Sequence, residues 1–406
     1  MSLSLPAPST TEPVRCPHFG PCGGCTSLDV PYGEEVRAKE EKLRTAFSRH
    51  EALARAPILP ILGATEPLLY RNSIKVPFGW SREGMVAGFF ARRSHRIVDL
   101  ETCLIQHPKL TALLLATKQI AMRLKIAIHD PTSGRGILRH LVARIGEGTG
   151  EMLAGLVVQA QGYGKIRGLA LELMEKLGKE GLVGVVQNIH ADDEDHAILG
   201  PETLPLAGRS YLDEMSDGLK MRTSLQSFVQ VNAAQAHVLF GEVLRLLDGS
   251  FHSQERPNLE GKRIVDLFCG VGPIALRAAR AGAQVEGIEY SEDSVRSARW
   301  AAKHNGLESR VAFHVGDATQ QLDKLSAKGS IDAVVVDPPR RGLSEKLIAS
   351  LIASSTKQVV YVSCDPFTFA RDLTLLSERF EIAVVRPIDL FPRTLHLETV
   401  ALLRRP

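Results

Sequence analysis

KRIVDLFCGVGPIALRAARAGAQVEGIEYS, residues 262–291, is the part of the sequence that most clearly specifies a fold. An apolar strand is predicted to end at Asp266, and the tight turn that follows contains Gly270 and Gly272 and leads into a helix. A second predicted strand ends at Glu289, about 20 residues after the glycines, where a carboxylate binds ribose hydroxyls. This layout predicts the first unit of a doubly wound, nucleotide-binding α/β domain.

The glycine turn by itself leaves the cofactor open. Gly270, Gly272 and Ala275 also satisfy the dinucleotide fingerprint, so an NAD-dependent oxidoreductase stays a candidate. Two later stretches favour S-adenosylmethionine instead. Asp317, in HVGDATQQL, lies where a carboxylate could reach an adenine amino group, and Asp337, in IDAVVVDPPRRGL, ends a third apolar strand. Such strand ends meet at the carboxyl edge of the sheet, where these folds bind ligands.

A third feature is the stretch VVYVSCDPFTFARD, residues 359–372. Asp365 suits a helix N-cap and Pro366 the first helical position, so Cys364 is predicted to lie just outside a helix N-terminus. There the helix dipole favours thiolate and lowers the thiol pKa, which predicts a nucleophile. Glu398 begins the last predicted strand, and a carboxylate in that setting is most often simply solvated.

A second group of cysteines lies near the N-terminus, in RCPHFGPCGGCTSLD. Cys16, Cys22 and Cys25 fall close together among glycines, and Cys103 is a remote fourth candidate. Four thiolates match either a closed zinc site or a 4Fe–4S cluster. The spacing lacks the paired CxxC arrangement of zinc ribbons and therefore favours iron and sulphur. A cluster held entirely by protein is expected to be structural or RNA-positioning.

Length and composition indicate a globular protein with several domains: 406 residues, 44% hydrophobic, 23% charged, with a net charge of +3. No signal peptide and no apolar run of ~20 residues is evident, so we expect a cytoplasmic protein without a membrane span. The expected order is a disordered tail at 1–15, the cysteine segment at 16–27, a helical segment at 28–56 packing on the catalytic domain, a β-rich RNA-binding domain at 57–215 and the α/β catalytic domain at 216–406.

Within the central domain, helices are predicted at 108–126 and 165–178, and IGEGTGE between two apolar runs predicts a hairpin. The acidic run Asp192–Asp195 is predicted to be a solvated loop. Basic residues that suit a phosphate backbone, or are simply scattered and solvated, are Arg71, Lys75, Arg92, Arg93, His95, Arg96, Arg135, Arg139 and His140.

The motifs CPHFGPCGGC, SFVQVN, DLFCGVG, GIE, DPPRRGL, VSCDP and DLFPRTLHLE together resemble the RNA uracil-5-methyltransferases that carry an iron–sulphur cluster. The likeness runs from Cys16 to the C-terminus. It implies a Rossmann-like catalytic domain and methyl transfer from S-adenosylmethionine to C5 of one uridine. The clustered cysteines point to the 23S rRNA branch more than to the tRNA branch. Only 15 residues precede Cys16, which leaves no room for the RNA-binding barrel of some members.

The resemblance also implies roles for individual residues. Cys364 falls on the nucleophile and Glu398 on the general base. The implied cluster ligands are Cys16, Cys22, Cys25 and Cys103. The implied cofactor-site residues are Gln230, Phe268, Gly270, Gly272, Pro273, Glu289, Asp317 and Asp337, with Pro273 standing where the family often has Asn.

The implied chemistry begins with attack of the Cys364 thiolate on C6 of uracil, which activates C5 for methylation. Glu398 then removes the C5 proton, and the uridine is expected to flip out of its stack. A tRNA enzyme and a non-catalytic RNA-binding factor remain alternatives. A cytosine-5-methyltransferase is less suitable because its nucleophile lies in a Pro-Cys motif. No protein partner is evident, so a monomer is expected.

Overall fold

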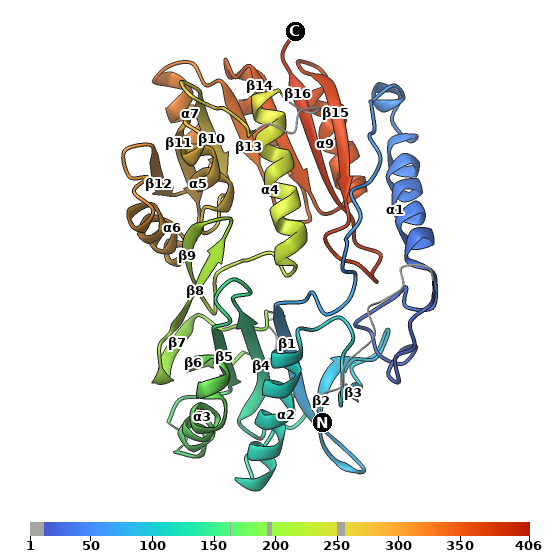
Figure 1. The fold of residues 1–406 in the computed structure, drawn as a ribbon, viewed down its shortest axis with the longest axis vertical. Coiled ribbons are helices and arrows are strands. Elements are labelled where there is room, and N and C mark those ends of the chain that lie inside the picture. Colours follow the sequence, from blue (N-terminus) through green and yellow to red (C-terminus); the bar gives the residue numbers. More distant parts are fainter. Residues whose placement is uncertain (1–11, 163, 193–196, 250–255) are drawn as a thin grey trace. The chain divides into compact units, whose positions relative to one another are not determined.

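The computed structural model describes residues 12–162, 164–192, 197–249 and 256–406 (Figure 1). Its chain divides into two compact units. Unit 1 comprises Met1–Tyr32, Glu66–Met215 and Thr223–Gln226, and unit 2 comprises Gly33–Thr65, Ser216–Arg222 and Ser227–Pro406. Two expectations fall partly outside the described residues: the disordered tail over 1–11 and the solvated loop over 193–195.

Unit 1 contains a seven-stranded sheet in the order β3-β2-β1-β4-β5-β6-β7. Its strands are β1 Ser73–Ser81, β2 Gly84–Phe90, β3 Ile97–Asp99, β4 Leu138–Ile145, β5 Met152–Val158, β6 Leu182–Ile189 and β7 Glu202–Gly208. The predicted hairpin is confirmed, because β4 and β5 pair antiparallel on either side of IGEGTGE. A separate two-stranded sheet joins β8 Tyr211–Ser216 to β9 Leu219–Ser224.

The two predicted helices of the central region are confirmed as α2 Pro108–Arg123 and α3 Gly164–Leu177, followed by the short η2 Gly178–Glu180. Both helices contribute leucines and isoleucines to one core with alternate residues of β1, β4 and β5. The intervening residues of β4, β5 and β6 form a smaller cluster on the opposite face with Leu212 and Leu225. Alternation of this kind is expected of strands that bury both faces.

Unit 2 contains the α/β sheet in the order β12-β11-β10-β13-β14-β16-β15. Its strands are β10 Arg263–Leu267, β11 Gln284–Glu289, β12 Val311–Val315, β13 Ala333–Val336, β14 Gln358–Ser363, β15 Glu381–Ile388 and β16 Glu398–Arg404. Strands β10 to β14 are parallel, and β16 runs antiparallel to both β14 and β15. The predicted doubly wound α/β fold is confirmed.

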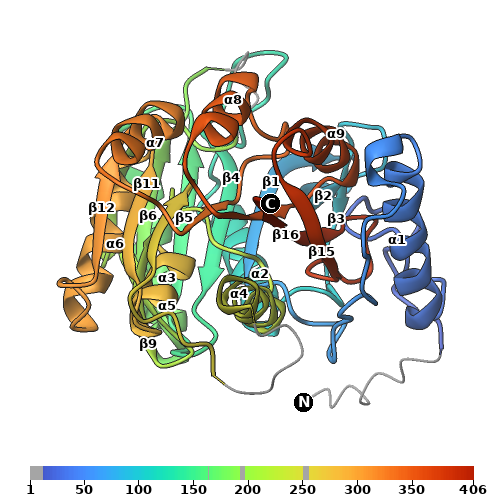
Figure 2. The same ribbon diagram turned by 90° about the horizontal axis from the view of Figure 1, so that it is seen from above.

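Helices cover both faces of this sheet, as Figure 2 shows. The first layer is α4 Ala233–Asp248, α5 Pro273–Arg280 and α6 Glu292–His304. The second layer is α1 Tyr32–Phe47, η1 Glu51–Leu53, α7 Ala318–Ala327, α8 Glu345–Ala353 and α9 Pro366–Leu376. Leu43 and Phe47 of α1 share a core with α9, where Phe47 lies 6.0 Å from Phe369 between ring centroids.

The segment after α1 differs from the sequence-based boundary, which opened the central domain at residue 57. Residues 57–65 belong to unit 2 and run along the edge strand β15. The backbone N–H of Leu59 donates to the Val385 carbonyl at 2.9 Å, and Leu62 donates to Pro387 at 3.0 Å. An edge strand has backbone groups free to pair, and this segment covers them.

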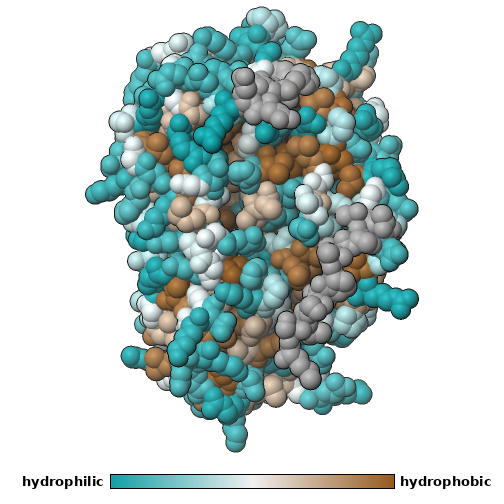
Figure 3. Space-filling model, viewed as in Figure 1, coloured by the Kyte–Doolittle hydropathy of each residue, from teal (hydrophilic) through white to brown (hydrophobic). Residues whose placement is uncertain are grey.

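Hydrophilic residues dominate the face of the molecule drawn in Figure 3. Among the described residues, no helix combines the length and the apolar composition required to cross a membrane.

Candidate active site

The turn after β10 holds an unusual backbone. Phe268 has φ +63°, Gly270 φ +55° and Gly272 φ +84°. Left-handed backbone at a non-glycine residue is strained and tends to occur at functional sites. A Cβ at Gly272 would lie 2.6 Å from the Phe313 ring, whereas a Cβ at Gly270 would meet no atom within 4 Å. The turn is therefore tightly packed at Gly272 and leaves open space beside Gly270.

Carboxylates surround this turn. Glu289 accepts hydrogen bonds from the backbone N–H of Gly270 at 3.1 Å and of Ser291 at 2.8 Å, which fixes its orientation. Asp266 is 1% exposed, and its Oδ2 accepts from the N–H of Ala275 at 3.1 Å. Its Oδ1 is buried without a partner, and burial raises its pKa well above the ordinary value. A buried polar atom without a hydrogen-bond partner is costly, so this atom suits a polar group of a ligand.

The other predicted cofactor residues occupy loops and helix starts of unit 2. Asp317 caps α7 by accepting from the N–H of Gln320 at 3.0 Å. Pro273 is the first residue of α5 and so presents no N–H. Gln230 lies two residues before Asn232, the N-cap of α4. These residues and the open glycine turn fit a nucleoside cofactor. Tyr290 was not singled out from the sequence, although it is 84% exposed directly after Glu289.

Cys364 and Glu398 come together across two neighbouring strands. Ser363 at the end of β14 pairs with Thr399 of β16, which runs antiparallel to it. Cys364 and Glu398 are the next residues on the same side of this pair, so they lie opposite each other at the carboxyl edge of the sheet. The predicted helix start is confirmed. Asp365 caps α9 by accepting from the N–H groups of Phe367 and Thr368 at 3.0 and 2.9 Å.

The predicted lowering of the Cys364 pKa is wrong. Burial and the nearby Glu398 carboxylate raise the pKa of the thiol to about 11, and Asp337 adds to the effect. Arg340 and the backbone N–H of Cys364 itself oppose the shift but do not outweigh it. Desolvation and like charge therefore determine the direction of the shift.

The two carboxyl groups beside Cys364, those of Glu398 and Asp337, also have raised pKa values. Glu398 is 2% exposed, and burial together with Asp337 raises its pKa well above the ordinary value. Burial raises the pKa of Asp337 to about 7. Arg340 is exposed, and one of its guanidinium nitrogens lies 3.2 Å from Nδ1 of His396. A thiol, two carboxyl groups held partly neutral and one cation are thus gathered at one edge of the sheet.

A buried ionic network supports the loop that leads to Glu398. The ammonium group of Lys39 in α1 donates to Glu35 at 2.7 Å, to Asp389 at 2.6 Å and to the carbonyl of Phe391 at 3.1 Å. Glu35 also accepts the backbone N–H of Arg393 at 2.7 Å, and Arg393 has φ +65°. Lys39 uses all three of its donors. Helix α1 therefore holds the loop at Asp389 and Phe391 through Lys39 and at Arg393 through Glu35.

The four N-terminal cysteines of unit 1 line one small cavity. Burial raises the pKa of Cys25 to about 12, with further contributions from Cys103, Cys22 and Cys16. No group of three His, Cys, Asp or Glu side chains is arranged as metal ligands in the part of the chain that the structure describes. The four thiols therefore share one cavity, but their arrangement among the described residues is not that of a metal site.

Two glycines of the cysteine segment allow its backbone to lie close to residues of β2. A Cβ at Gly23 would lie 2.7 Å from the carbonyl oxygen of Phe90, and one at Gly24 would lie 3.0 Å from the Phe89 ring. Of the three local glycines, Gly20 has the expected positive φ, +96°. Arg92 donates to the carbonyl of Cys25 at 2.8 Å and so ties the segment to the end of β2.

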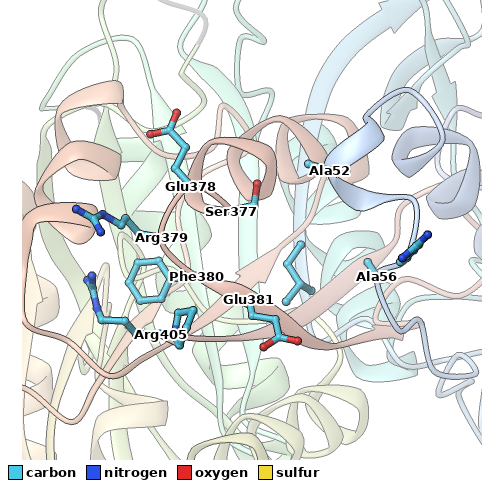
Figure 4. Close-up of a pocket in the computed structure, with 11 residues that line it drawn as sticks. Ala52, Ala56, Ser377, Glu378, Arg379, Phe380, Glu381 and Arg405 are labelled. Atoms are coloured by element: carbon cyan, nitrogen blue, oxygen red, sulfur yellow. The ribbon is translucent and has the colours of Figure 1, made fainter.

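A separate pocket in unit 2 lies away from this chemistry (Figure 4). Its lining includes Phe380 and Glu381 at the start of β15 and Arg405 after β16. Because Gln358 pairs with Arg404 while Ser363 pairs with Thr399, this pocket lies at the opposite end of the strands from Cys364. Arg405 is already bonded to the carbonyls of Thr356 and Ser354. The pocket is no candidate for methyl transfer.

Comparisons with known proteins identify the family. The model of the tRNA (uracil-5-)-methyltransferase family matches residues 202–406, and proteins described as uncharacterized RNA methyltransferases align along nearly the whole chain. The chain belongs to this family. It is an RNA methyltransferase that uses S-adenosylmethionine.

Two bacterial relatives illustrate the likeness. An uncharacterized RNA methyltransferase of Halalkalibacterium halodurans is 35% identical over 393 residues, covering 96% of this chain and 82% of that protein. One of Gloeobacter violaceus is 36% identical over 392 residues, covering 96% and 82%. Among solved structures, the Pyrococcus abyssi tRNA (uracil-54, C5)-methyltransferase in complex with S-adenosyl-L-homocysteine is similar, with a TM-score of 0.74, 25% identity and coverage of 95% of this chain and 86% of that one.

Proposed function

We propose that this methyltransferase modifies C5 of a uridine in 23S rRNA, with Cys364 as nucleophile and Glu398 as general base. The observation that carries the proposal is the pairing of Ser363 with Thr399, which sets Cys364 and Glu398 side by side at the carboxyl edge. A thiol, a buried carboxyl group and a cofactor turn at one sheet edge suit carbon methylation better than redox chemistry.

The chemistry follows from the weak nucleophilicity of C5. The Cys364 thiolate bonds to C6 of uracil, and the electrons of the C5–C6 double bond move into an enolate. S-Adenosylmethionine, when bound, supplies the electrophilic methyl group that C5 takes up. Glu398 then removes the C5 proton, the double bond reforms and the C6–S bond breaks to regenerate the thiolate.

Asp337 has a complementary role in the proposal. With a pKa of about 7, it is protonated in a large share of molecules at neutral pH. A neutral carboxyl group donates a hydrogen bond, so Asp337 can stabilise the enolate oxygen that develops on uracil. Glu289, Asp317 and Asp266 would hold the cofactor, with the unpartnered Oδ1 of Asp266 accepting one of its donors.

The proposal includes a 4Fe–4S cluster held by Cys16, Cys22, Cys25 and Cys103, whose side chains line one cavity. This cysteine segment is also the reason for choosing 23S rRNA. A tRNA substrate is the second candidate, and it is favoured by the similarity to the Pyrococcus abyssi tRNA (uracil-54, C5)-methyltransferase.

The test uses S-adenosylmethionine carrying a labelled methyl group, with unmodified 23S rRNA and unmodified tRNA in separate reactions. Digestion to nucleosides should place the label in 5-methyluridine from rRNA. Labelled 5-methyluridine from tRNA alone would support the proposed reaction but show that tRNA, not 23S rRNA, is the substrate. Label in another nucleoside would contradict methylation at C5 of uridine.

A further inference from the structure

Unit 2 presents an exposed surface beside Cys364 and Glu398 that the chemistry itself does not use. Phe367 lies three residues after Cys364 and is 38% exposed, and Leu395 lies three residues before Glu398 and is 61% exposed. Close to one reactive pair, these two side chains offer apolar contact area to a bound partner.

Basic residues from the α1 segment contact both of these residues, one at its ring and the other at its backbone. The guanidinium group of Arg49, just after α1, lies 4.9 Å from the centroid of the Phe367 ring. The ammonium group of Lys42 donates to the backbone carbonyl of Leu395 at 3.0 Å. We name Lys42, Arg49, Phe367 and Leu395 the flanking surface.

The flanking surface is continuous with the reactive edge. The hydroxyl of Thr368 donates to the carbonyl of Arg340 at 3.1 Å, and the Arg340 guanidinium lies 3.2 Å from the ring of His396. Phe367 and Leu395 are the immediate chain neighbours of Thr368 and His396. A chain of contacts thus connects Arg49 to the loop before Glu398.

The charge of this surface is positive. Lys42 lies in α1 and Arg49 in the turn just after it, while Glu34 and Glu41 fall on another stripe of the helix. Alternating cations and stackable apolar groups are the means by which proteins hold single-stranded nucleic acid. The ligand with this complementary chemistry is a polyanion with planar bases.

We propose that the flanking surface binds the single-stranded RNA adjoining the target uridine, with Lys42 and Arg49 on phosphates and Phe367 and Leu395 against bases. The proposal rests on the proposed function for the identity of the neighbouring nucleotide. It assigns to residues of the catalytic unit a share of RNA binding, in addition to the basic residues of the central domain.

The test measures the affinity of the full chain for a fluorescein-labelled oligouridylate of 20 nucleotides by anisotropy at several salt concentrations. The double variant Lys42→Gln/Arg49→Gln should lower the slope of log affinity against log salt by about 1.4, because each phosphate contact on a single strand contributes ~0.7. Phe367→Ala should weaken binding roughly tenfold and leave this slope unchanged.

The matched control is Arg37→Gln/Arg44→Gln, which removes the same charge from exposed positions on another stripe of α1. An equal loss in both double variants, or no loss in the first, would overturn the proposal. Affinity for S-adenosylhomocysteine and the thermal midpoint verify folding. Because no methyl transfer is needed, this result is independent of which nucleoside carries the label.

Discussion

At the scale of single residues, the carboxyl groups around Cys364 decide when its thiol ionises. With a pKa raised to about 11, the thiol is almost entirely protonated at neutral pH in the free enzyme. The rate at which iodoacetamide alkylates Cys364 should therefore rise about tenfold per pH unit between roughly pH 7 and 10. Mass spectrometry of the peptide that contains Cys364 measures this rate, and a plateau below about pH 8 would contradict the high pKa.

Asp337 gives a pH dependence of stability with a defined sign. Its folded-state pKa of about 7 lies above the ordinary 3.8, so its stabilising effect is complete below the ordinary value and is lost as the pH rises through 7. In Asp337→Asn, the free energy of unfolding should therefore fall less between about pH 5 and 8, by about 2–3 kcal/mol.

Urea denaturation at the two pH values measures this difference. The control is Asp332→Asn, because a backbone bond from Arg263 and the ammonium group of Lys357 lower the Asp332 pKa. Asp332 stays ionised over this range and should leave the pH dependence unchanged. Equal pH dependences in Asp337→Asn and the wild type would show that Asp337 ionises normally.

At the scale of elements, α1 determines the position of the loop before Glu398. Lys39 is 3% exposed and forms ion pairs with both Glu35 and Asp389, so Lys39→Met removes the cation that bridges two buried carboxylates. The free energy of unfolding should drop by about 3–5 kcal/mol, the cost of breaking a buried pair. Chemical denaturation measures this loss.

The matched control is Arg44→Met, an exposed cation on the same helix, which should change stability by less than about 0.5 kcal/mol. A Lys39→Met protein as stable as this control would show that the network contributes nothing. In a folded Lys39→Met protein, turnover should fall because the loop bearing Glu398 loses its support.

Local signals explain what could be predicted for these elements. Asp365 and Pro366 specify the start of α9 through backbone chemistry within four residues, and the glycine turn specifies β10 and α5 in the same way. The network of Lys39 and Asp389 joins residues 350 positions apart. Hydrophobic periodicity along the sequence cannot predict a contact between residues so far apart. The covering of β15 by residues 57–62 was missed for the same reason.

At the scale of the whole molecule, the cysteine segment decides whether the protein carries iron. Anaerobically purified protein should contain roughly four iron and four sulphide ions per chain, as a 4Fe–4S cluster requires. Cys25→Ser should lose them, and the control Cys364→Ser should keep them. Iron and sulphide analysis measures both, and zinc in place of iron would replace the proposed cluster.

The fold and the membership of an RNA uracil-5-methyltransferase family could be predicted because several short motifs occur together along one chain. The pKa values of the site residues could not be predicted from the sequence. The Cys364 pKa is raised first by burial and then by Glu398 and Asp337, and these groups come together only through the pairing of β14 with β13 and β16. Sequence reasoning identified the helix dipole and missed the opposing charges.

A denaturing gel of Glu398→Gln, incubated with S-adenosylmethionine and its RNA substrate, tests the roles of Glu398 and Cys364 together. Loss of the base should trap the methylated RNA on Cys364, giving a slowly migrating protein–RNA band. The band should be absent from Glu398→Gln/Cys364→Ala. No band with the single variant, or a band that survives in the double variant, would contradict a mechanism in which Cys364 attacks C6 and Glu398 removes the C5 proton.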